Sequence, residues 1–114
     1  MLTETINLSF TFEFKRNLRA LAKKYRSIRT DLQPLIDQLL TGVLPGDQVP
    51  GVNLTIFKVR LQNSDIQKGK RAGYLCIYYL KTRSDIILIT VYSKSEQADV
   101  TAAKILSILQ EMAP

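Results

Sequence analysis

The sequence predicts an α+β fold in which a strand and two helices precede three strands and a final helix. Three observations support this prediction. Apolar residues alternate with polar ones near the N-terminus and again within residues 54–93. They recur every three or four residues in two segments before residue 44 and in one after residue 100. The 114 residues are expected to form a single domain, 1–114, around one core.

The N-terminal region changes from strand to helix near residues 11–13. The alternating apolar residues of a half-buried strand are Ile6, Leu8, Phe10 and Phe12. The apolar residues that follow have the spacing of one helix face: Phe14, Leu18, Leu21, Ala22 and Tyr25. Thr11 directly precedes this pattern, and threonine is a favoured N-cap residue. We therefore expect Thr11 to cap the first helix.

A second helix is predicted to follow residues 27–30. Thr30 and Gln33 match a capping box, which would place Pro34 in the first turn, where proline is tolerated. The apolar face consists of Leu32, Leu35, Ile36, Leu39, Leu40 and Val43. Gly42 is suited to end this helix, and the short joint to the first helix predicts a helical hairpin. Residues 44–53, with two prolines and two glycines, predict a loop.

Three strands are predicted in the second half of the chain. Their ranges are 54–61, 73–80 and 86–93. Short connections make them antiparallel, and the third is almost wholly apolar, which predicts an internal place in the sheet. The first strand must cross the helices to join them. Thr101 can cap a last helix, whose apolar face consists of Ile105, Leu106, Ile108, Leu109 and Met112.

Composition excludes several classes of function. The chain has no histidine, which excludes Ser-His, Cys-His and histidine-based ribonuclease mechanisms and argues against most transition-metal sites. The single cysteine, Cys76, cannot form an internal disulfide, which fits a reducing cytoplasm. It alternates with Leu75 and Ile77, so we interpret it as a small buried apolar residue rather than a nucleophile. Neither a signal peptide nor a membrane span is apparent.

The net charge of +6 and the pI of about 9.6 favour polyanionic partners, although many basic domains bind no nucleic acid. One basic group covers the first helix and its exit: Lys15, Arg16, Arg19, Lys23, Lys24, Arg26 and Arg29. This group can be an ordinary solvated face. A second group lies in the sheet region: Lys58, Arg60, Lys68, Lys70, Arg71, Lys81, Arg83 and Lys94.

The second group has the spacing of a binding surface. Lys58 and Arg60 are two residues apart on one strand and therefore share a face, as do Tyr92 and Lys94 at the end of another. A sheet with helices on one face and cations with tyrosines on the other suits nucleic acid, because cations bind phosphates and phenol rings stack on bases. The remaining sheet tyrosines are interpreted as packing residues: Tyr74, Tyr78 and Tyr79.

Four segments of the sheet region carry a recognisable pattern. They are FKVRL at 57–61, KGKRAGY at 68–74, IYY at 77–79 and IILITVYSKSE at 86–96. Together they resemble the RelE/HigB branch of type II toxin–antitoxin toxins. The Lys-Gly-Lys loop and the Tyr-x-Lys-x-Glu ending are the most specific parts, and the resemblance extends weakly over nearly the whole chain. It implies a RelE-like fold, with a helical hairpin packed on a curved antiparallel sheet.

The resemblance also implies an activity. Such toxins are mRNA endonucleases that inhibit translation, with ribosome-bound mRNA as the expected substrate here. They work in the cytoplasm with no metal or cofactor, and a cognate antitoxin, expected to be a small DNA-binding protein, neutralises them in a hetero-oligomer. The RNA 2′-hydroxyl attacks the adjacent phosphate, which requires a base, cations and an acid.

The implied site residues follow the matching motifs. Residues expected to act in cleavage are Arg60, Lys70, Arg71, Tyr92, Lys94 and Glu96, and further RNA contacts are expected from Lys58, Lys68 and Arg83. Arg60, Lys70 and Arg71 are expected to bind the phosphate and to stabilise the charge that develops on it. Tyr92 orients or stacks on a base, and Lys94 is a general acid or a second clamp. Glu96 is either the base or a residue that favours the start of a helix.

Leu75 departs from the family pattern, which has an arginine directly after the Gly-aromatic pair. Loss of one cation from a transition-state clamp costs a factor of about one hundred or more in rate, although Arg60 or Arg71 can compensate. The first alternative is therefore a catalytically weakened relative that acts as an antitoxin-binding or regulatory module. A second is a ParE-type gyrase inhibitor, because one fold can host different functions.

Overall fold

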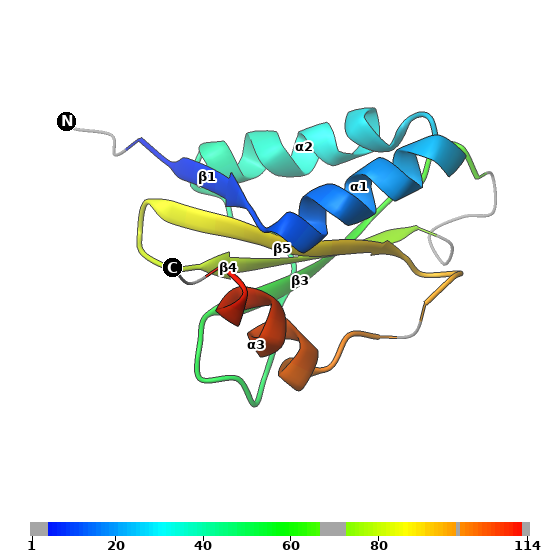
Figure 1. Cartoon of the computed structure of the whole chain (residues 1–114). Coiled ribbons are helices and arrows are strands. Elements are labelled where there is room, and N and C mark those ends of the chain that lie inside the picture. Colours follow the sequence, from blue (N-terminus) through cyan, green and yellow to red (C-terminus); the bar gives the residue numbers. More distant parts are fainter. Residues whose placement is uncertain (1–4, 67–72, 98, 113–114) are drawn as a thin grey trace.

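The computed structural model describes residues 5–66, 73–97 and 99–112 (Figure 1). In chain order the elements are β1 (Asn7–Phe10), α1 (Phe12–Lys24), α2 (Ile28–Leu40), β2 (Asp47–Gln48), β3 (Ile56–Leu61), β4 (Tyr74–Leu80), β5 (Asp85–Ser93) and α3 (Ala102–Gln110). Strands and helices occur in the predicted order, with one additional short strand, β2. The predicted α+β class is confirmed.

The five strands form one sheet in the order β1-β5-β4-β3-β2. The pairs among β2, β3, β4 and β5 are antiparallel, whereas β1 runs parallel to β5, so the sheet is mixed. The predicted internal position of β5 is confirmed, since β1 and β4 flank it. No helix in the described ranges has both the length and the apolar character required to cross a membrane.

The loop predicted for residues 44–53 is wrong at Asp47 and Gln48. These residues form β2 and pair with Lys58 and Phe57 of β3. Gly46 makes this pairing possible, because a side chain there would collide with the Lys58 carbonyl, and its φ of +97° favours glycine. The backbone bonds of β2 come from a strand that is distant in sequence, so local turn residues do not reveal them.

Helices lie on both faces of the sheet (Figure 1). α1 and α2 cover one face, and the large core between them and the sheet includes Phe14, Leu21, Ile28, Leu32, Leu35, Leu39, Tyr74, Cys76, Tyr78, Leu88 and Val91. α3 covers part of the other face over a smaller cluster: Ile56, Leu75, Ile77, Ile89, Tyr92, Ile105 and Ile108. The interpretation of Cys76 as a buried apolar residue is confirmed, as is the packing role of Tyr74 and Tyr78.

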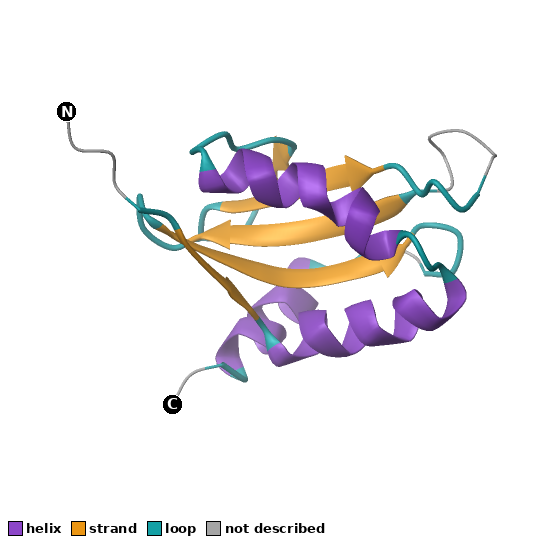
Figure 2. Ribbon diagram, turned by 90° about the horizontal axis from the view of Figure 1, so that it is seen from above, coloured by secondary structure: helices purple, strands orange, loops and turns teal. Residues whose placement is uncertain are grey.

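α1 begins where the sequence predicts. The Thr11 hydroxyl oxygen accepts a hydrogen bond from the Phe14 amide at 2.9 Å, which makes Thr11 the N-cap, and the hydroxyl donates to the Ile89 carbonyl. The Asn17 amide donates to the Thr90 hydroxyl at 3.0 Å. α1 therefore lies alongside the part of β5 that extends past the end of β1 (Figure 2).

α2 begins earlier than predicted, at Ile28. The Thr30–Gln33 capping box is wrong, and Pro34 lies inside the helix rather than in its first turn. The cause is a distant cap: the Asp65 carboxylate accepts from the Ser27 amide at 2.8 Å and from the Ser27 hydroxyl at 3.0 Å. The Pro34 ring removes one helical bond to Thr30, and both residues are exposed, so water can satisfy the free carbonyl.

α3 is capped by Thr101, whose hydroxyl oxygen accepts from the Lys104 amide at 3.2 Å, as predicted. Ile105 and Ile108 are buried against the sheet. Leu106 and Met112, predicted on the same face, are 39% and 38% exposed. The short helix touches the sheet through one narrow stripe, so the apolar face is only partly used.

Candidate active site

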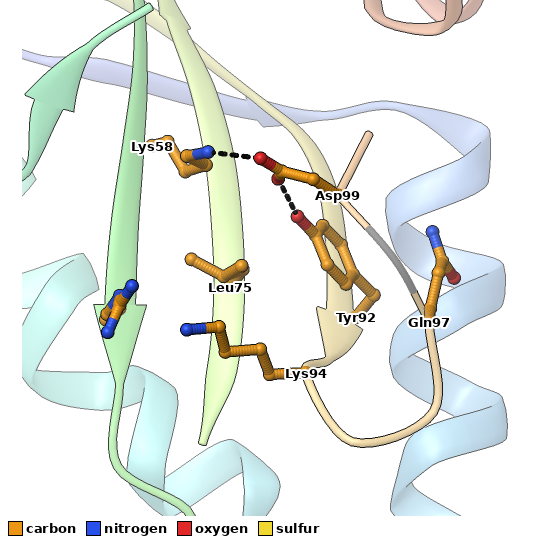
Figure 3. Close-up of a pocket in the computed structure, with 7 residues that line it drawn as sticks. Lys58, Leu75, Tyr92, Lys94, Gln97 and Asp99 are labelled. Atoms are coloured by element: carbon orange, nitrogen blue, oxygen red, sulfur yellow. Dashed lines mark hydrogen bonds and ion pairs between the residues drawn. The ribbon is translucent and has the colours of Figure 1, made fainter. Parts of the chain in front are cut away.

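The part of the sheet face that α3 leaves uncovered contains a pocket of about 340 Å³ (Figure 3). Its walls come from β3, β4, β5 and the segment that leads from β5 to α3. The lining residues are Lys58, Arg60, Leu75, Tyr92, Lys94, Gln97 and Asp99. Four of the nine residues predicted to act in cleavage or to contact RNA are in this set.

Strand register brings these side chains together. Arg60 pairs with Leu75 and Leu75 with Tyr92, so the three are direct neighbours across three strands. Alternation along β3 then places Lys58 on the same face as Arg60. At the end of β5 the Lys94 amide donates to the Gly73 carbonyl at 3.0 Å, which extends the ladder by one residue.

Gly73 is required for this arrangement. A side chain at that position would collide with the Leu61 carbonyl oxygen at the end of β3. The glycine of the Gly-aromatic motif therefore lets β4 approach β3 closely just before the pocket. Its role is structural, and it fixes the register that places Leu75 between Arg60 and Tyr92.

Asp99 is a pocket residue that the sequence analysis missed. Lys58 Nζ donates to Asp99 Oδ2 at 2.7 Å, and the Tyr92 hydroxyl donates to Asp99 Oδ1 at 2.8 Å (Figure 3). The donor Lys58 lies 41 residues earlier in the chain. Of the signals in the sequence, only the position of an acid a few residues beyond Tyr92 and Lys94 points to Asp99.

The protonation states in the pocket follow from these contacts. The hydrogen bonds from Lys58 and then Tyr92 hold the pKa of Asp99 below its ordinary value, so this carboxyl is ionised at neutral pH. Burial, together with the hydrogen bond to Asp99, raises the pKa of Tyr92 well above its ordinary value. At neutral pH the pocket thus has an ionised carboxyl at Asp99 and a neutral phenol at Tyr92.

Glu96, predicted as a possible base, is not in this pocket. Its carboxylate forms an ion pair with Lys24 and accepts a hydrogen bond from the Tyr25 hydroxyl at 3.2 Å, both near the end of α1. Glu96 lines a separate pocket of about 250 Å³ between α1 and β5. The bond to Lys24 holds the pKa of Glu96 below its ordinary value. The Lys94 amide still pairs with Gly73, but the Glu96 amide donates to the Ser93 carbonyl in a turn, so Glu96 no longer follows the strand alternation.

Arg83, predicted to contact RNA, is also apart from the pocket. It lies in the turn between β4 and β5, at the opposite end of these strands from Leu75 and Tyr92. On β4, the five residues from Leu75 to Leu80 alone span roughly 17 Å of extended strand. The remaining predicted residues, Lys68, Lys70 and Arg71, lie outside the described residues, and their roles stay predictions.

Comparison with known proteins gives a match among solved structures. No family model matches the chain, and no curated protein matches it. A solved structure of the Escherichia coli toxin RelE, a double arginine-to-alanine mutant in the free state, matches with a TM-score of 0.54 and 16% identity. The alignment covers 96% of this chain and 100% of the RelE chain. The fold is RelE-like.

Within this RelE-like fold, the pocket has properties that suit a phosphodiester. Lys58, Arg60 and Lys94 can neutralise a phosphate and the additional charge that develops on it in a transition state. Tyr92 is only 3% exposed, so its ring offers almost no surface for a base to stack on. Its hydroxyl is the part that faces the pocket, and this differs from the stacking role considered from the sequence.

Leu75 occupies the centre of the site. It is 5% exposed and packs in the smaller cluster beneath α3, with Arg60 on one side and Tyr92 on the other. Where the family pattern has an arginine, the middle strand here contributes an apolar side chain. The cations of the pocket accordingly come from β3 and from the end of β5.

Proposed function

We propose that this protein is a toxin of a type II toxin–antitoxin system that cleaves mRNA without a metal and so inhibits translation. The RelE-like fold supports the class of protein. The single observation that carries the proposal is the convergence of Lys58, Arg60, Lys94 and the Tyr92 hydroxyl on one pocket from three strands. In this proposal a cognate antitoxin is the protein partner, and mRNA on the ribosome is the substrate.

The reaction proposed is attack of the RNA 2′-hydroxyl on the adjacent phosphorus, with loss of the hydroxyl proton to water and departure of the 5′-oxygen. Arg60 binds the non-bridging phosphate oxygens, since its planar guanidinium can donate two parallel hydrogen bonds. Lys94 protonates the leaving oxygen or binds the phosphate as a second cation. Lys68, Lys70 and Arg71 are proposed to add phosphate contacts.

The proposal is tested by incubating the purified protein with mRNA in EDTA, with and without translating ribosomes. We expect cleavage that leaves a 2′,3′-cyclic phosphate and a 5′-hydroxyl. The control is a double variant, Lys58→Met with Lys94→Met, which keeps much of each aliphatic stem and removes two cations. Absence of cleavage in both arrangements, or equal cleavage by the control, would refute the enzymatic proposal.

The second candidate function is a disarmed toxin relative that binds an antitoxin without cutting RNA, and Leu75 is the observation that favours it. Leu75→Arg places a guanidinium between Arg60 and Tyr92, where the family pattern has one. If the protein is disarmed, this change should raise growth inhibition on induced expression by a factor of about one hundred. An unchanged phenotype, together with cleavage by the natural chain, would reject this candidate.

A further inference from the structure

The Asp99 carboxylate occupies donors that the pocket would otherwise offer to an anion. One oxygen accepts from Lys58 and the other from the Tyr92 hydroxyl (Figure 3). The two non-bridging oxygens of a phosphodiester can accept from the same kinds of donor. We propose that Lys58 and Tyr92 form a phosphate subsite that Asp99 fills in the free protein, and that an RNA phosphate displaces Asp99 on binding. The inference rests on the proposed function for the identity of the anion.

Asp99 is held weakly enough to be displaced. Its side chain is 61% exposed and that of Lys58 is 34% exposed, so water screens the ion pair. Exposed pairs of this kind contribute little to stability. Asp99 also lies between β5 and α3, outside both elements, so its carboxylate can move away without breaking a helix or a strand.

The surrounding charge favours phosphate over Asp99. Among the described residues, Lys58 is the only cation that forms an ion pair with Asp99. A phosphate at the same position would have Arg60 and Lys94 nearby as well, because both line the pocket. An RNA chain offers several phosphates at once and can draw on all three cations, whereas an isolated small anion gains less.

The first measurement compares Asp99→Asn with the natural chain. Asparagine keeps an oxygen that can accept from Tyr92 but removes the negative charge. The control is Asp37→Asn, which makes the same change in net charge on α2, on the opposite face of the sheet. The probes are a 2′-O-methyl RNA hexanucleotide, which cannot be cleaved, and inorganic phosphate, with affinities from fluorescence anisotropy and from NMR shift titration.

We expect Asp99→Asn to bind both probes about fivefold more tightly than the natural chain. This is the effect of removing the charge of a carboxylate that competes weakly for Lys58. Asp37→Asn should bind them as the natural chain does. In cleavage assays KM for RNA should fall with Asp99→Asn. Thermal unfolding curves of both variants should match that of the natural chain, which confirms that each is folded.

A double-mutant cycle separates displacement from simple repulsion. If Asp99 competes by holding Lys58, then Asp99→Asn should gain little affinity in a Lys58→Met background. A fivefold gain that persists without Lys58 would mean general repulsion and would overturn the inference. Weaker or unchanged binding by Asp99→Asn would overturn it as well.

The two proposals can fail separately. If the natural chain cuts no RNA but inorganic phosphate shows the Lys58-dependent effect of Asp99→Asn, the proposed function fails and the subsite stands as a general phosphate site. If RNA is cut and Asp99→Asn changes neither affinity, the proposed function stands and the displacement inference fails.

Discussion

The two faces of the sheet use the same strands for opposite purposes. On the face under α1 and α2, Val59, Cys76 and Val91 lie in a closed apolar core. One residue along each strand, Arg60 and Tyr92 flank Leu75 at the pocket on the other face. A single sheet therefore separates an apolar core on one face from a pocket lined by charged side chains on the other.

The two faces of the sheet differ because helices cover them to different extents. Two helices of 13 residues each span the first face, whereas α3 has nine residues and covers only part of the second. The uncovered part of the second face can hold charged side chains, because their ends reach water while their stems pack on the strands. Stability thus comes mainly from the first face, and the pocket lies in the uncovered part of the second.

The largest predicted effect follows from placing the same charge on the two faces at adjacent residues. Cys76→Arg should cost more than about 5 kcal/mol of unfolding free energy and leave the protein unfolded, because the guanidinium has no partner in the closed core. Leu75→Arg should cost only about 1–3 kcal/mol and stay folded, because its charged end can reach the pocket. Circular dichroism with urea titration measures both.

Cys76→Ala is the matched control for this comparison, with an expected loss of about 1 kcal/mol from the smaller side chain. Folded Cys76→Arg with a free energy of unfolding close to that of Leu75→Arg would show that the two faces do not differ as described.

The second prediction compares an arginine at the pocket with an arginine in the turn between β4 and β5. Arg60→Ala should reduce the rate of RNA cleavage about a hundredfold, because Arg60 is proposed to bind the phosphate. Arg83→Ala removes an identical charge at the hairpin end of the strands and should change the rate less than about twofold at moderate salt. Single-turnover cleavage assays measure both, and equal losses would mean that net charge, rather than the pocket, determines the activity.

Much of the difference between the faces was predictable from sequence. The two-residue spacing of Lys58 and Arg60 in β3 predicted that both lie on one face, and both line the pocket. Strict alternation suffices because a strand has a period of two wherever pairing continues. The prediction failed where the chain left regular structure, as at Glu96, which follows the end of β5.

Two other errors share one physical cause, which is contact between residues far apart in sequence. Asp65 caps α2 through Ser27, 38 residues away, so a local capping box misplaced the start of the helix. Asp99 meets Lys58 across 41 residues, so a search for basic motifs found the cations without the carboxylate that occupies one of them. Local patterns contain no information about such contacts until the fold is known.

The third prediction concerns the hydrogen bonds between Asp65 and Ser27 at the start of α2. Asp65→Ala should lower the free energy of unfolding by about 1 kcal/mol, because it removes the acceptor for the Ser27 amide and hydroxyl. Asp37→Ala removes the same charge from the exposed C-terminal half of α2 and should cost less than about 0.5 kcal/mol. Urea unfolding measures the free energy of unfolding of both variants. Equal losses would show that Asp65 does not stabilise the start of α2.

The smallest predicted effect comes from a comparison of Asp85 and Asp99, two acids that lie at the start of β5 and beyond its end. Hydrogen bonds from Thr82 and then Asn7 hold the pKa of Asp85 below its ordinary value of 3.8. A carboxyl whose pKa is lowered by folding stabilises the protein above its unfolded pKa, and this contribution is lost as the pH falls through the lower, folded pKa. The melting temperature of Asp85→Asn should therefore fall less than that of the natural chain between about pH 5 and pH 3.

The pKa of Asp99 is lowered too, but in the proposal above an RNA phosphate binds its partner Lys58 and displaces Asp99. Saturating the protein with the uncleavable RNA should therefore alter the titration of Asp99, followed by NMR of its carboxyl carbon, and leave that of Asp85 unchanged. Equal shifts at both carboxyls would mean that bound RNA acts through its overall charge. A shift confined to Asp99 would place the phosphate at one end of the sheet, where the open face has its pocket.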